Sequence, residues 1–464
     1  MISATRERAH VRSSTSAAAI FATARHKSDI GYAKTHHVQY VPTRADALEE
    51  EECASGEADS KFSAAAEAML DGNGEAEMEP SLVDFTKDVP AEKLERLYRG
   101  AGKATQFLSL PERQMFTKMI YETFYKDEGT KPMDPAMLYQ ASLEIQWVEQ
   151  WMTNVAKEKQ LSIDDARREV KKALLERVDL HKPLSYICGS QPFFGCNIHC
   201  EAPLLCPRPE TEMWTHWLVY NHLNRVRGSS EQKIEETSAQ QLNILDVCCG
   251  TGCIGVALAK HVPNAVVTAL DILPQAVAAS QLNAQRNGIP ESRYKAIESD
   301  MFDYFTEQNA SSLSAVAQIN RQVENSPHNL QAAPERLLGT IRPEFVGIFD
   351  VIVSNPPYVL PEQYIDLPRT ITHWESKTAL VGDDYRESRQ YLYFKELCVH
   401  GAKLLKPRHM RPAVLRETPN MVIEVGLQAH MVADLMEKSG LWKDVCIHLD
   451  YGQQERWVSA VASH

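Results

Sequence analysis

The chain has 464 residues, and at about 150 residues per domain this length allows two or three domains. Its 49 Lys and Arg residues against 62 Asp and Glu residues give a net charge of −13, which argues against holding duplex nucleic acid mainly by neutralising phosphates. The ten cysteines are too dilute for a disulfide scaffold. Because the sequence contains no run of eighteen apolar residues, we expect no membrane span.

The first two segments differ sharply in charge. Residues 1–44 contain seven basic residues and two acidic ones and are rich in Ser, Thr and Ala, a composition typical of an organellar transit segment. A tail without a targeting role is the alternative. Residues 45–90 are strongly acidic and poor in large apolar side chains, so we expect a disordered linker there.

Residues 91–182 show a helical pattern. Helices are expected to open at Pro111, at Pro135 and at Ser162, where Asp165 three residues later resembles a capping box. After Ser162, apolar residues recur at three- and four-residue spacing and therefore share one helix face. This stretch predicts a small N-terminal helical domain.

From residue 183 to the end, the pattern changes to strands. A short hairpin is expected over residues 193–200 and a terminal hairpin over 445–462. Between them, apolar runs alternate with helical patterns, which predicts βαβ units and a mostly parallel sheet. These runs are residues 244–247, 266–270, 349–353 and 421–425. Residues 308–343 and 406–419 are polar or rich in proline and are expected to be surface insertions.

A glycine turn follows the first apolar run. Gly250, Gly252 and Gly255 match the dinucleotide-binding fingerprint, and Asp271 ends the next run, where a carboxylate can accept from ribose hydroxyls. Glycine at these positions lets a ligand approach the backbone. The spacing fits either NAD or S-adenosylmethionine. Asp246 favours the second, because a carboxylate repels a pyrophosphate and attracts a cationic sulfonium compound. A glycine turn without a ligand is the remaining alternative.

The sequence Asn355-Pro356-Pro357-Tyr358 directly follows the third apolar run. Neither proline has an N–H, so the chain must leave the sheet at this point, where open α/β sheets bind ligands. The Asn355 side-chain oxygen and the Pro356 carbonyl are two acceptors suited to an –NH₂ group on a planar substrate. Holding both hydrogens aims the nitrogen lone pair at an incoming methyl carbon, and Tyr358 can pack on the substrate's flat face.

Several motifs in order resemble the HemK/PrmC family of release factor glutamine-N5 methyltransferases. The resemblance covers roughly residue 138 to the C-terminus. The motifs are residues 184–189, 205–212, the glycine turn, Asp271, residues 299–302, residues 355–358, residues 378–382 and residues 450–456. The resemblance implies an α/β fold, with a seven-stranded class I S-adenosylmethionine-dependent (Rossmann-like) domain preceded by a helical domain and a β-hairpin linker.

The resemblance also implies a function and roles for residues. S-adenosylmethionine would methylate the glutamine of the Gly-Gly-Gln motif in a class-one peptide-chain release factor, and the helical domain would dock that protein. Together with the basic N-terminus, this suggests a mitochondrial member of the family. Residues expected to bind the methyl donor are Asp246, Gly250, Thr251, Gly252, Asp271, Asp300, Met301, Phe302 and Asn355. Those expected to act in catalysis are Asn355, Pro356, Pro357 and Tyr358.

Three alternative functions remain open. Methylation of an adenine or cytosine amino group in DNA or RNA would use the same chemistry on a flipped-out base, although no direct nucleic-acid binding is expected. An NAD-linked oxidoreductase and a non-catalytic binding module are the other two. No metal site is expected, because the spacing of Cys196, Cys200 and Cys206 fits no zinc pattern and predicts buried thiols instead.

Some residues have two interpretations. Arg208, Glu210 and Glu212 are expected either to position substrate or to brace the hairpin by ion pairs. Cys248 replaces the first glycine of the family's loop, which a straight strand end should tolerate; Cys248, Cys249 and Cys253 are expected to pack rather than to react. Glu424, at the end of the fourth apolar run, is expected either to anchor the floor of the active site or simply to be capped, and is left without an assigned role.

Overall fold

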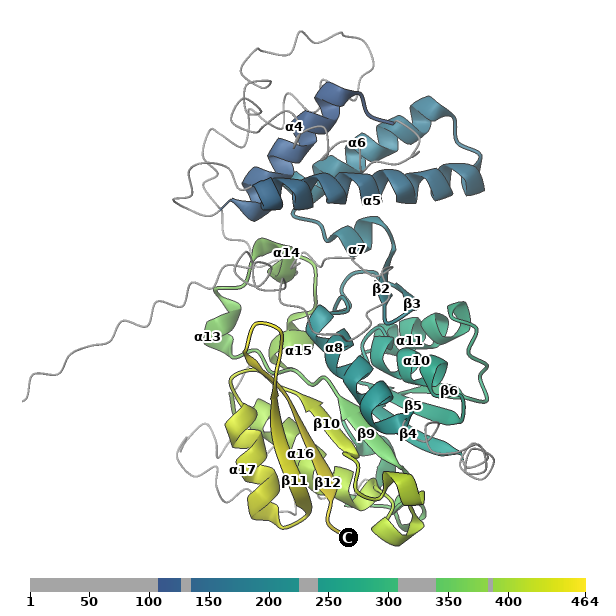
Figure 1. Cartoon of the computed structure of the whole chain (residues 1–464), viewed down its shortest axis with the longest axis vertical. Helices are drawn as coiled ribbons and strands as arrows, with labels where there is room; N and C mark the ends of the chain where they lie inside the picture. The colour runs from purple at the N-terminus through teal and green to yellow at the C-terminus, as the bar shows by residue number, and fades with distance from the viewer. Residues whose placement is uncertain (1–106, 127–134, 225–240, 308–338, 383–386) are drawn as a thin grey trace, which may run out of the picture. The chain divides into compact units, whose positions relative to one another are not determined.

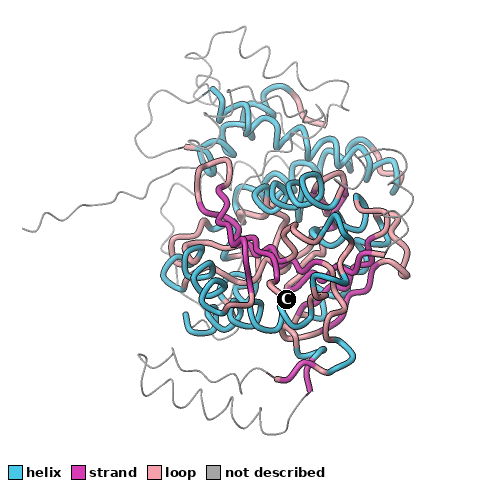
Figure 2. Tube along the Cα trace, turned by 60° about the horizontal axis from the view of Figure 1, so that its bottom comes forward, coloured by secondary structure: helices cyan, strands magenta, loops and turns pink. Residues whose placement is uncertain are grey.

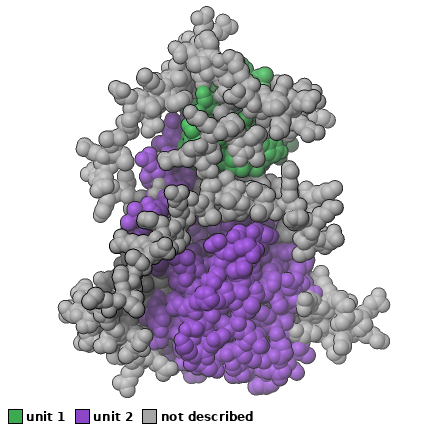
Figure 3. All heavy atoms as spheres, turned by 60° about the vertical axis from the view of Figure 1, so that its left-hand side comes forward, with its two compact units in different colours: residues 1–37, 68–174 green, residues 38–67, 175–464 purple. Residues whose placement is uncertain are grey.

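The computed structural model describes residues 107–126, 135–224, 241–307, 339–382 and 387–464. Residues 1–44, 45–90 and most of the expected insertion 308–343 lie outside these ranges. The described residues divide into two compact units, one up to residue 174 and one from residue 175 onward, shown in different colours in Figure 3.

The first unit is helical. It contains α4 (Leu110–Ile120), the π-helical turn η3 (Tyr121–Tyr125), α5 (Pro135–Lys159) and most of α6 (Ile163–Asp179) (Figure 1). The expected helix starts are confirmed: the Ser162 hydroxyl accepts a hydrogen bond from the Asp165 N–H at 3.1 Å, which satisfies a donor at the start of α6.

The second unit opens with a short helix and a hairpin. These are α7 (Leu184–Ile187) and the antiparallel strands β2 (Ser190–Phe193) and β3 (Cys196–His199), which confirm the expected hairpin. Two helical segments follow, α8 (Pro209–Leu218) and η4 (Val219–Leu223). Pro209 at the first position of α8 costs no hydrogen bond, because the first helical N–H groups have no partner within the helix.

A seven-stranded sheet forms the centre of this unit. Its strands are β4 (Leu242–Val247), β5 (Ala265–Asp271), β6 (Tyr294–Glu298), β9 (Val351–Ser354), β10 (Met421–Glu424), β11 (Trp442–Leu449) and β12 (Glu455–Ala462). The order is β11-β12-β10-β9-β4-β5-β6, and β12 is antiparallel to both its neighbours. This is the strand order expected of a class I methyltransferase, so the predicted fold class is confirmed.

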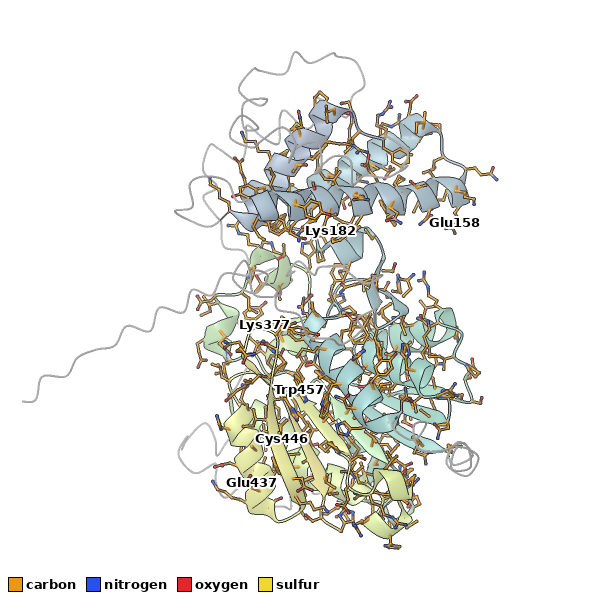
Figure 4. The ribbon with its side chains drawn as sticks, viewed as in Figure 1. Glu158, Lys182, Lys377, Glu437, Cys446 and Trp457 are labelled. Carbon is orange, nitrogen blue, oxygen red and sulfur yellow. The ribbon has the colours of Figure 1, made fainter. Side chains whose placement is uncertain are left out.

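Helices cover both faces of the sheet (Figures 1 and 2). α8, α10 (Cys253–His261) and α11 (Pro274–Arg286) pack on one face, and α16 (Glu387–Leu404) and α17 (Ala429–Ser439) pack on the other. Alternate strand residues serve alternate faces, as Ile244 and Leu245 do. Trp457, labelled in Figure 4, stacks on His448 with ring centroids 4.8 Å apart on the α8 face.

Short elements connect these layers. They show that parts of the two expected surface insertions, residues 308–343 and 406–419, belong to the folded core. They are η6 (Asp303–Phe305), β7 (Thr306–Glu307), β8 (Thr340–Ile341), η9 (Pro343–Phe345), α13 (Pro361–Tyr364), α14 (Arg369–Thr372), α15 (Lys377–Val381), η10 (Arg408–Met410) and η11 (Ala413–Leu415). β8 pairs with β7 and buries Ile341, so the end of the expected insertion belongs to the core.

Residues 406–419 are not a simple surface insertion either. Arg411 is buried, and its guanidinium donates to the carbonyls of Lys406 and Ala462, while Leu415 packs against the α8 face of the sheet. A buried guanidinium that bonds to carbonyls fastens this segment to the end of β12, which composition alone does not indicate. In the described ranges, no helix combines the length and the apolar character that crossing a bilayer requires.

Candidate functional site

A cavity lies at the carboxyl ends of β4, β5 and β9. Six predicted site residues line it: Gly250, Asp271, Asp300, Met301, Asn355 and Pro357. The other lining residues are Leu204, Leu205, Val247, Cys248, Leu270, Ile272, Leu273, Ala276, Ser299, Thr378, Ala379 and Tyr393. The cavity is therefore mostly apolar with a few polar groups, which is typical of a small-molecule site.

Asp271 is fixed at the wall of this cavity by backbone donors. Its two carboxylate oxygens accept from the Gly250 N–H at 2.8 Å and from the Leu273 N–H at 3.0 Å. Burial raises the pKa of Asp271, and these N–H donors act in the opposite direction. Each carboxylate oxygen has a second lone pair, so Asp271 can still accept from the hydroxyls of a ligand.

Two of the three glycines in the turn are required by close packing, whereas we expected all three to let a ligand approach the backbone. A Cβ on Gly252, where φ is +78°, would lie 2.5 Å from the Ser280 hydroxyl, and one on Gly255 would lie 2.9 Å from the Asp246 carboxylate. Only Gly250, at φ +53°, has open space beside it and lines the cavity. Thr251 is buried and, like Gly252, lies outside the cavity wall.

Asp246 is fully buried and does not line the cavity, so its expected direct contact with a ligand has no support in the geometry. One carboxylate oxygen accepts from the Gly255 N–H at 2.9 Å, near the start of α10, where a negative charge is favourable. The other oxygen is buried and has no hydrogen-bond partner among the described residues. Burial raises the pKa of Asp246 to about 7, and nearby Asp271 adds to the rise.

Cys248 contradicts the expectation of a straight strand end. Its φ is +60°, in the left-handed region that glycine adopts most easily, so the cysteine carries strain that the family's glycine avoids. Its thiol lines the cavity, 3.6 Å from the Met301 sulfur. Burial raises the pKa of Cys248, Cys249 and Cys253, which disfavours the reactive thiolates, in keeping with the expected packing role.

The turn after β6 places Asp300 and Met301 at the cavity. The Ser299 hydroxyl donates to the Met301 carbonyl and accepts from the Tyr304 N–H, both at 3.0 Å, which holds the turn in shape. Phe302 lies in the core, edge-on to His400, and does not line the cavity, so of these two neighbours it is Met301 that the cavity exposes to a ligand.

The end of β9 holds Asn355 in a chain of hydrogen bonds. The Ser354 hydroxyl donates to the Val247 carbonyl at 2.9 Å and so ties the ends of β9 and β4 together. The Asn355 Nδ2 donates to the Thr211 Oγ1 at 3.4 Å, and Thr211 donates to the Glu424 Oε2 at 2.6 Å. Thus α8, β9 and β10 meet at Asn355.

Glu424 accepts three hydrogen bonds at this meeting point. Besides Thr211, the donors are the Trp214 Nε1 at 2.8 Å and the Tyr358 hydroxyl at 3.0 Å. Burial raises the pKa of Glu424, whereas the Thr211 and Trp214 donors and the Arg456 charge lower it. Glu424, left without a role by the sequence, is therefore the buried acceptor that organises the end of β9.

Tyr358 makes contacts within the protein that limit its availability to a substrate. Its ring packs against Gly426, where a Cβ would lie 3.0 Å from the ring, and its hydroxyl is used by Glu424. Burial and the Glu424 charge raise the pKa of Tyr358. Neither Tyr358 nor the buried Pro356 lines the cavity, so their expected contacts with a substrate stay predictions.

The segment before α8 forms part of the cavity wall and is clamped to the segment before α15. Arg208 pairs with the buried Glu375, which also accepts from the Cys206 N–H at 3.3 Å. The Ser376 N–H donates to the Pro203 carbonyl at 2.7 Å. Glu212 accepts from the Phe194 N–H at 2.7 Å in the hairpin turn. For Arg208 and Glu212 the geometry therefore favours bracing over substrate contact.

Replacing Arg208 by alanine is expected to destabilise the fold by about 3 kcal/mol, because it removes the guanidinium that pairs with the buried Glu375 carboxylate. Urea unfolding would measure the change. Replacing Arg168, an exposed arginine that pairs with Asp165 on α6, should cost well under about 1 kcal/mol. Equal losses for the two variants would contradict a clamp at Arg208.

The cysteines near the hairpin are small buried side chains, as expected. Cys196, Cys200 and Cys206 are all buried, and Cys206 lies 2.9 Å from the Ser185 hydroxyl. In the part of the chain that the structure describes, no three His, Cys, Asp or Glu side chains are grouped so as to hold a metal ion.

Several site residues were not singled out from the sequence. Leu205 and Thr378 belong to motifs that the resemblance quoted, and Ile272 follows Asp271 directly, so their positions carried some signal. Thr211 lies within the quoted motif 205–212, and Glu424 was noted at the end of its run, but neither pattern indicated contact with Asn355, because only the packing of α8 against β10 brings them together. Tyr393, within α16, had no signal in the sequence.

Comparisons with known proteins agree that the chain is similar to methyltransferases. A family model described as "Methyltransferase small domain" matches residues 228–313. A release factor glutamine methyltransferase of Flavobacterium psychrophilum is 27% identical over 241 residues, covering 52% of this chain and 66% of the relative. One of Chlorobaculum tepidum is 28% identical over 283 residues, covering 61% and 75%. The aligned part thus spans about two thirds of the first relative's length.

Solved structures resemble the chain more weakly. The hMettl16 catalytic domain in complex with a MAT2A 3'UTR hairpin is 14% identical and gives a TM-score of 0.36, covering 65% of this chain and 82% of that chain. A methyltransferase from Pyrococcus furiosus is 14% identical and gives a TM-score of 0.32, covering 57% and 89%. The fold assignment therefore rests on the strand order of the sheet itself.

Proposed function

We propose that this chain, a methyltransferase homologous to the release factor glutamine methyltransferases, methylates the side-chain nitrogen of the glutamine in the Gly-Gly-Gln motif of a class-one release factor, with S-adenosylmethionine as the donor. The observation that carries the proposal is the position of Asn355. Its side-chain amide lies at the wall of the cavity, with the nitrogen turned toward Thr211, which leaves the oxygen as an acceptor for a substrate –NH₂.

The cavity fits S-adenosylmethionine. Asp271 offers carboxylate oxygens to ribose hydroxyls, and the side chains of Ile272 and Met301 offer apolar surface to an adenine ring. The open space beside Gly250 allows the polar tail of the donor to approach the backbone. When bound, S-adenosylmethionine supplies an electrophilic methyl carbon.

The chain's own residues deal with the weak nucleophile. An amide nitrogen is unreactive because its lone pair is delocalised into the carbonyl. Acceptance of its two hydrogens by the Asn355 oxygen and the Pro356 carbonyl aims that lone pair toward the cavity and favours pyramidal nitrogen. The nitrogen loses a proton to water once the new bond has formed, so no separate base is required before the transfer.

We place this activity in mitochondria, on the release factor that ends translation there. The basic, Ser- and Ala-rich composition of residues 1–44 supports this location, because acid-poor segments rich in arginine and serine direct proteins to organelles. Expression of the full chain fused to a fluorescent protein would test the location. Fluorescence spread through the cytosol would overturn it.

The proposed function is tested by methyl transfer from labelled S-adenosylmethionine. The purified chain is incubated with a class-one release factor, and the peptide that contains Gly-Gly-Gln is examined by mass spectrometry. We expect one methyl group on the glutamine side chain and none on a release factor in which that glutamine is replaced by alanine. Labelling of DNA or transfer RNA, with the release factor unmodified, would instead establish an amino-methyltransferase acting on adenine or cytosine.

Replacing Asp271 by asparagine is expected to weaken S-adenosylmethionine binding about thirtyfold, because an amide cannot accept from both backbone N–H groups and the ribose at once. Isothermal calorimetry would measure the dissociation constant. Glu298→Gln is the matched control, because Glu298 pairs with Asp271 in the sheet register but is exposed and outside the cavity wall. Unchanged affinity in the Asp271 variant would contradict the assignment.

A further inference from the structure

We propose that Trp214, Glu424 and Thr211 are positioning residues that fix the orientation of the Asn355 amide, so that its oxygen rather than its nitrogen faces the substrate. The proposal rests on the proposed function and deepens it. It assigns to two residues of α8 and one of β10 the task of making Asn355 an acceptor.

Asn355 needs such a device because the two ends of a carboxamide are almost the same size. Rotation by half a turn exchanges the oxygen with the –NH₂ group, and packing alone hardly distinguishes them. Only one orientation works, since a substrate –NH₂ requires an acceptor and would be repelled by a second –NH₂. A group beside Asn355 must therefore fix which end of the amide, the –NH₂ or the oxygen, faces the substrate.

The first residue that constrains this orientation is Trp214. An indole N–H is a donor only, and it points at the Glu424 Oε2 from 2.8 Å, so that oxygen must be an acceptor. A proton taken up by Glu424 would lie on Oε1, which faces the Tyr358 hydroxyl, a group able to donate or accept. The acceptor character of Oε2 therefore does not depend on the charge of Glu424.

Thr211 transmits this constraint from Glu424 to Asn355. Its hydroxyl lies 2.6 Å from the same Oε2, and because Oε2 has no proton to give, Thr211 must donate. Only the lone pairs of Thr211 are left to face Asn355, so the Asn355 nitrogen must turn toward Thr211, as it does at 3.4 Å. This last hydrogen bond is long, and such contacts often tighten when substrate is bound.

Because these residues are buried, the reversed orientation of the Asn355 amide is energetically disfavoured. Trp214, Thr211 and Glu424 are at most 1% exposed, so the hydrogen bonds they lose cannot be replaced freely by bulk water. A buried polar atom left without a partner costs on the order of 1–3 kcal/mol, which is enough to exclude the reversed amide in most molecules. Trp214 is thus the fixed donor, and Asn355 is the group whose direction it sets.

The test compares Thr211→Val, which removes the hydroxyl at nearly constant volume, with Thr211→Ser, which keeps it. Methyl transfer to a class-one release factor should fall between tenfold and a hundredfold in kcat for Thr211→Val, with the KM for the release factor and the affinity for S-adenosylmethionine within threefold of the original values. Thr211→Ser should restore most of kcat. Glu424→Gln should also keep most of it, because Trp214 holds the glutamine oxygen at the same place.

Thr215→Val is the matched control. Thr215 lies one turn further along α8, is equally buried, and donates only to the Thr211 backbone carbonyl within the helix. Its loss should leave kcat within threefold. In the Asn355→Ala background, Thr211→Val should have no further effect on kcat, because there is no amide left to orient. An additive loss would overturn the proposal.

A second readout does not depend on activity. With asparagine labelled by ¹⁵N, the side-chain –NH₂ signals of Asn355 are identified by their absence in Asn355→Ala. We expect these signals to shift, and their exchange with water to quicken, in Thr211→Val but not in Thr215→Val. Unmoved Asn355 signals overturn the positioning role even if the chain methylates release factors. Conversely, shifted signals in a chain that labels no release factor support the orientation and overturn the proposed function.

Discussion

Alanine at position 355 is expected to lower kcat for methylation of the release factor by roughly a thousandfold. The Asn355 oxygen is the side-chain acceptor that aims the substrate nitrogen, and alanine leaves the –NH₂ free to rotate. Because this acceptor acts most strongly as the nitrogen becomes pyramidal, the loss should fall on kcat more than on KM. Single-turnover transfer of labelled methyl to the Gly-Gly-Gln peptide would measure it.

The same variant must be shown to fold and to bind the donor. Its melting temperature should change little, and its affinity for S-adenosylmethionine should fall by less than the thirtyfold expected of the Asp271 variant, because Asp271 and not Asn355 offers acceptors to the ribose. Asn420→Ala is a useful comparison, because Asn420 is a buried asparagine of this unit that bonds to the Ala462 backbone and lies outside the cavity wall. It should lose stability and retain kcat per folded molecule. Near-normal transfer by Asn355→Ala would refute the assigned role.

The site residues that sequence patterns predicted best are those that directly follow strands. Asp271 is the last residue of β5 and Asn355 directly follows β9, and parallel strands place their carboxyl ends at one edge, so their meeting in one cavity could be foreseen. Their partners could not be. Thr211 is 144 residues away from Asn355 in the chain, and only tertiary packing of α8 brings the two together.

The fold was predictable where local patterns are strong and less so elsewhere. The apolar runs gave β4, β5, β9 and β10, but β6 reads Tyr-Lys-Ala-Ile-Glu and has the mixed composition of an edge strand. Cys248 shows the opposite error. A cysteine carries no local sign of a left-handed backbone, and it is the surrounding turn that imposes φ +60°.

The buried carboxyl group of Asp246 leads to a prediction about stability. Replacing Asp246 by asparagine keeps an oxygen for the Gly255 N–H and removes a carboxylate whose pKa burial raises to about 7, against an ordinary value of 3.8. Between about pH 4 and pH 7 the folded chain holds a proton that the unfolded chain releases. The free energy of unfolding of the original chain should therefore fall as pH rises through this window, by at most about 4 kcal/mol.

Asparagine does not titrate, so the variant lacks this contribution and gains stability relative to the original chain as pH increases. We expect the difference between the two in free energy of unfolding to move by about 2 kcal/mol or more from pH 5 to pH 8, measured by urea unfolding at both values. Asp434→Asn, which removes an exposed carboxylate on α17, should show no such movement. A parallel pH dependence for the Asp246 variant and the original chain would mean that this carboxylate is ionised throughout. In that case the pairing with Gly255, together with a water or ligand at its second oxygen, would have to compensate for its burial.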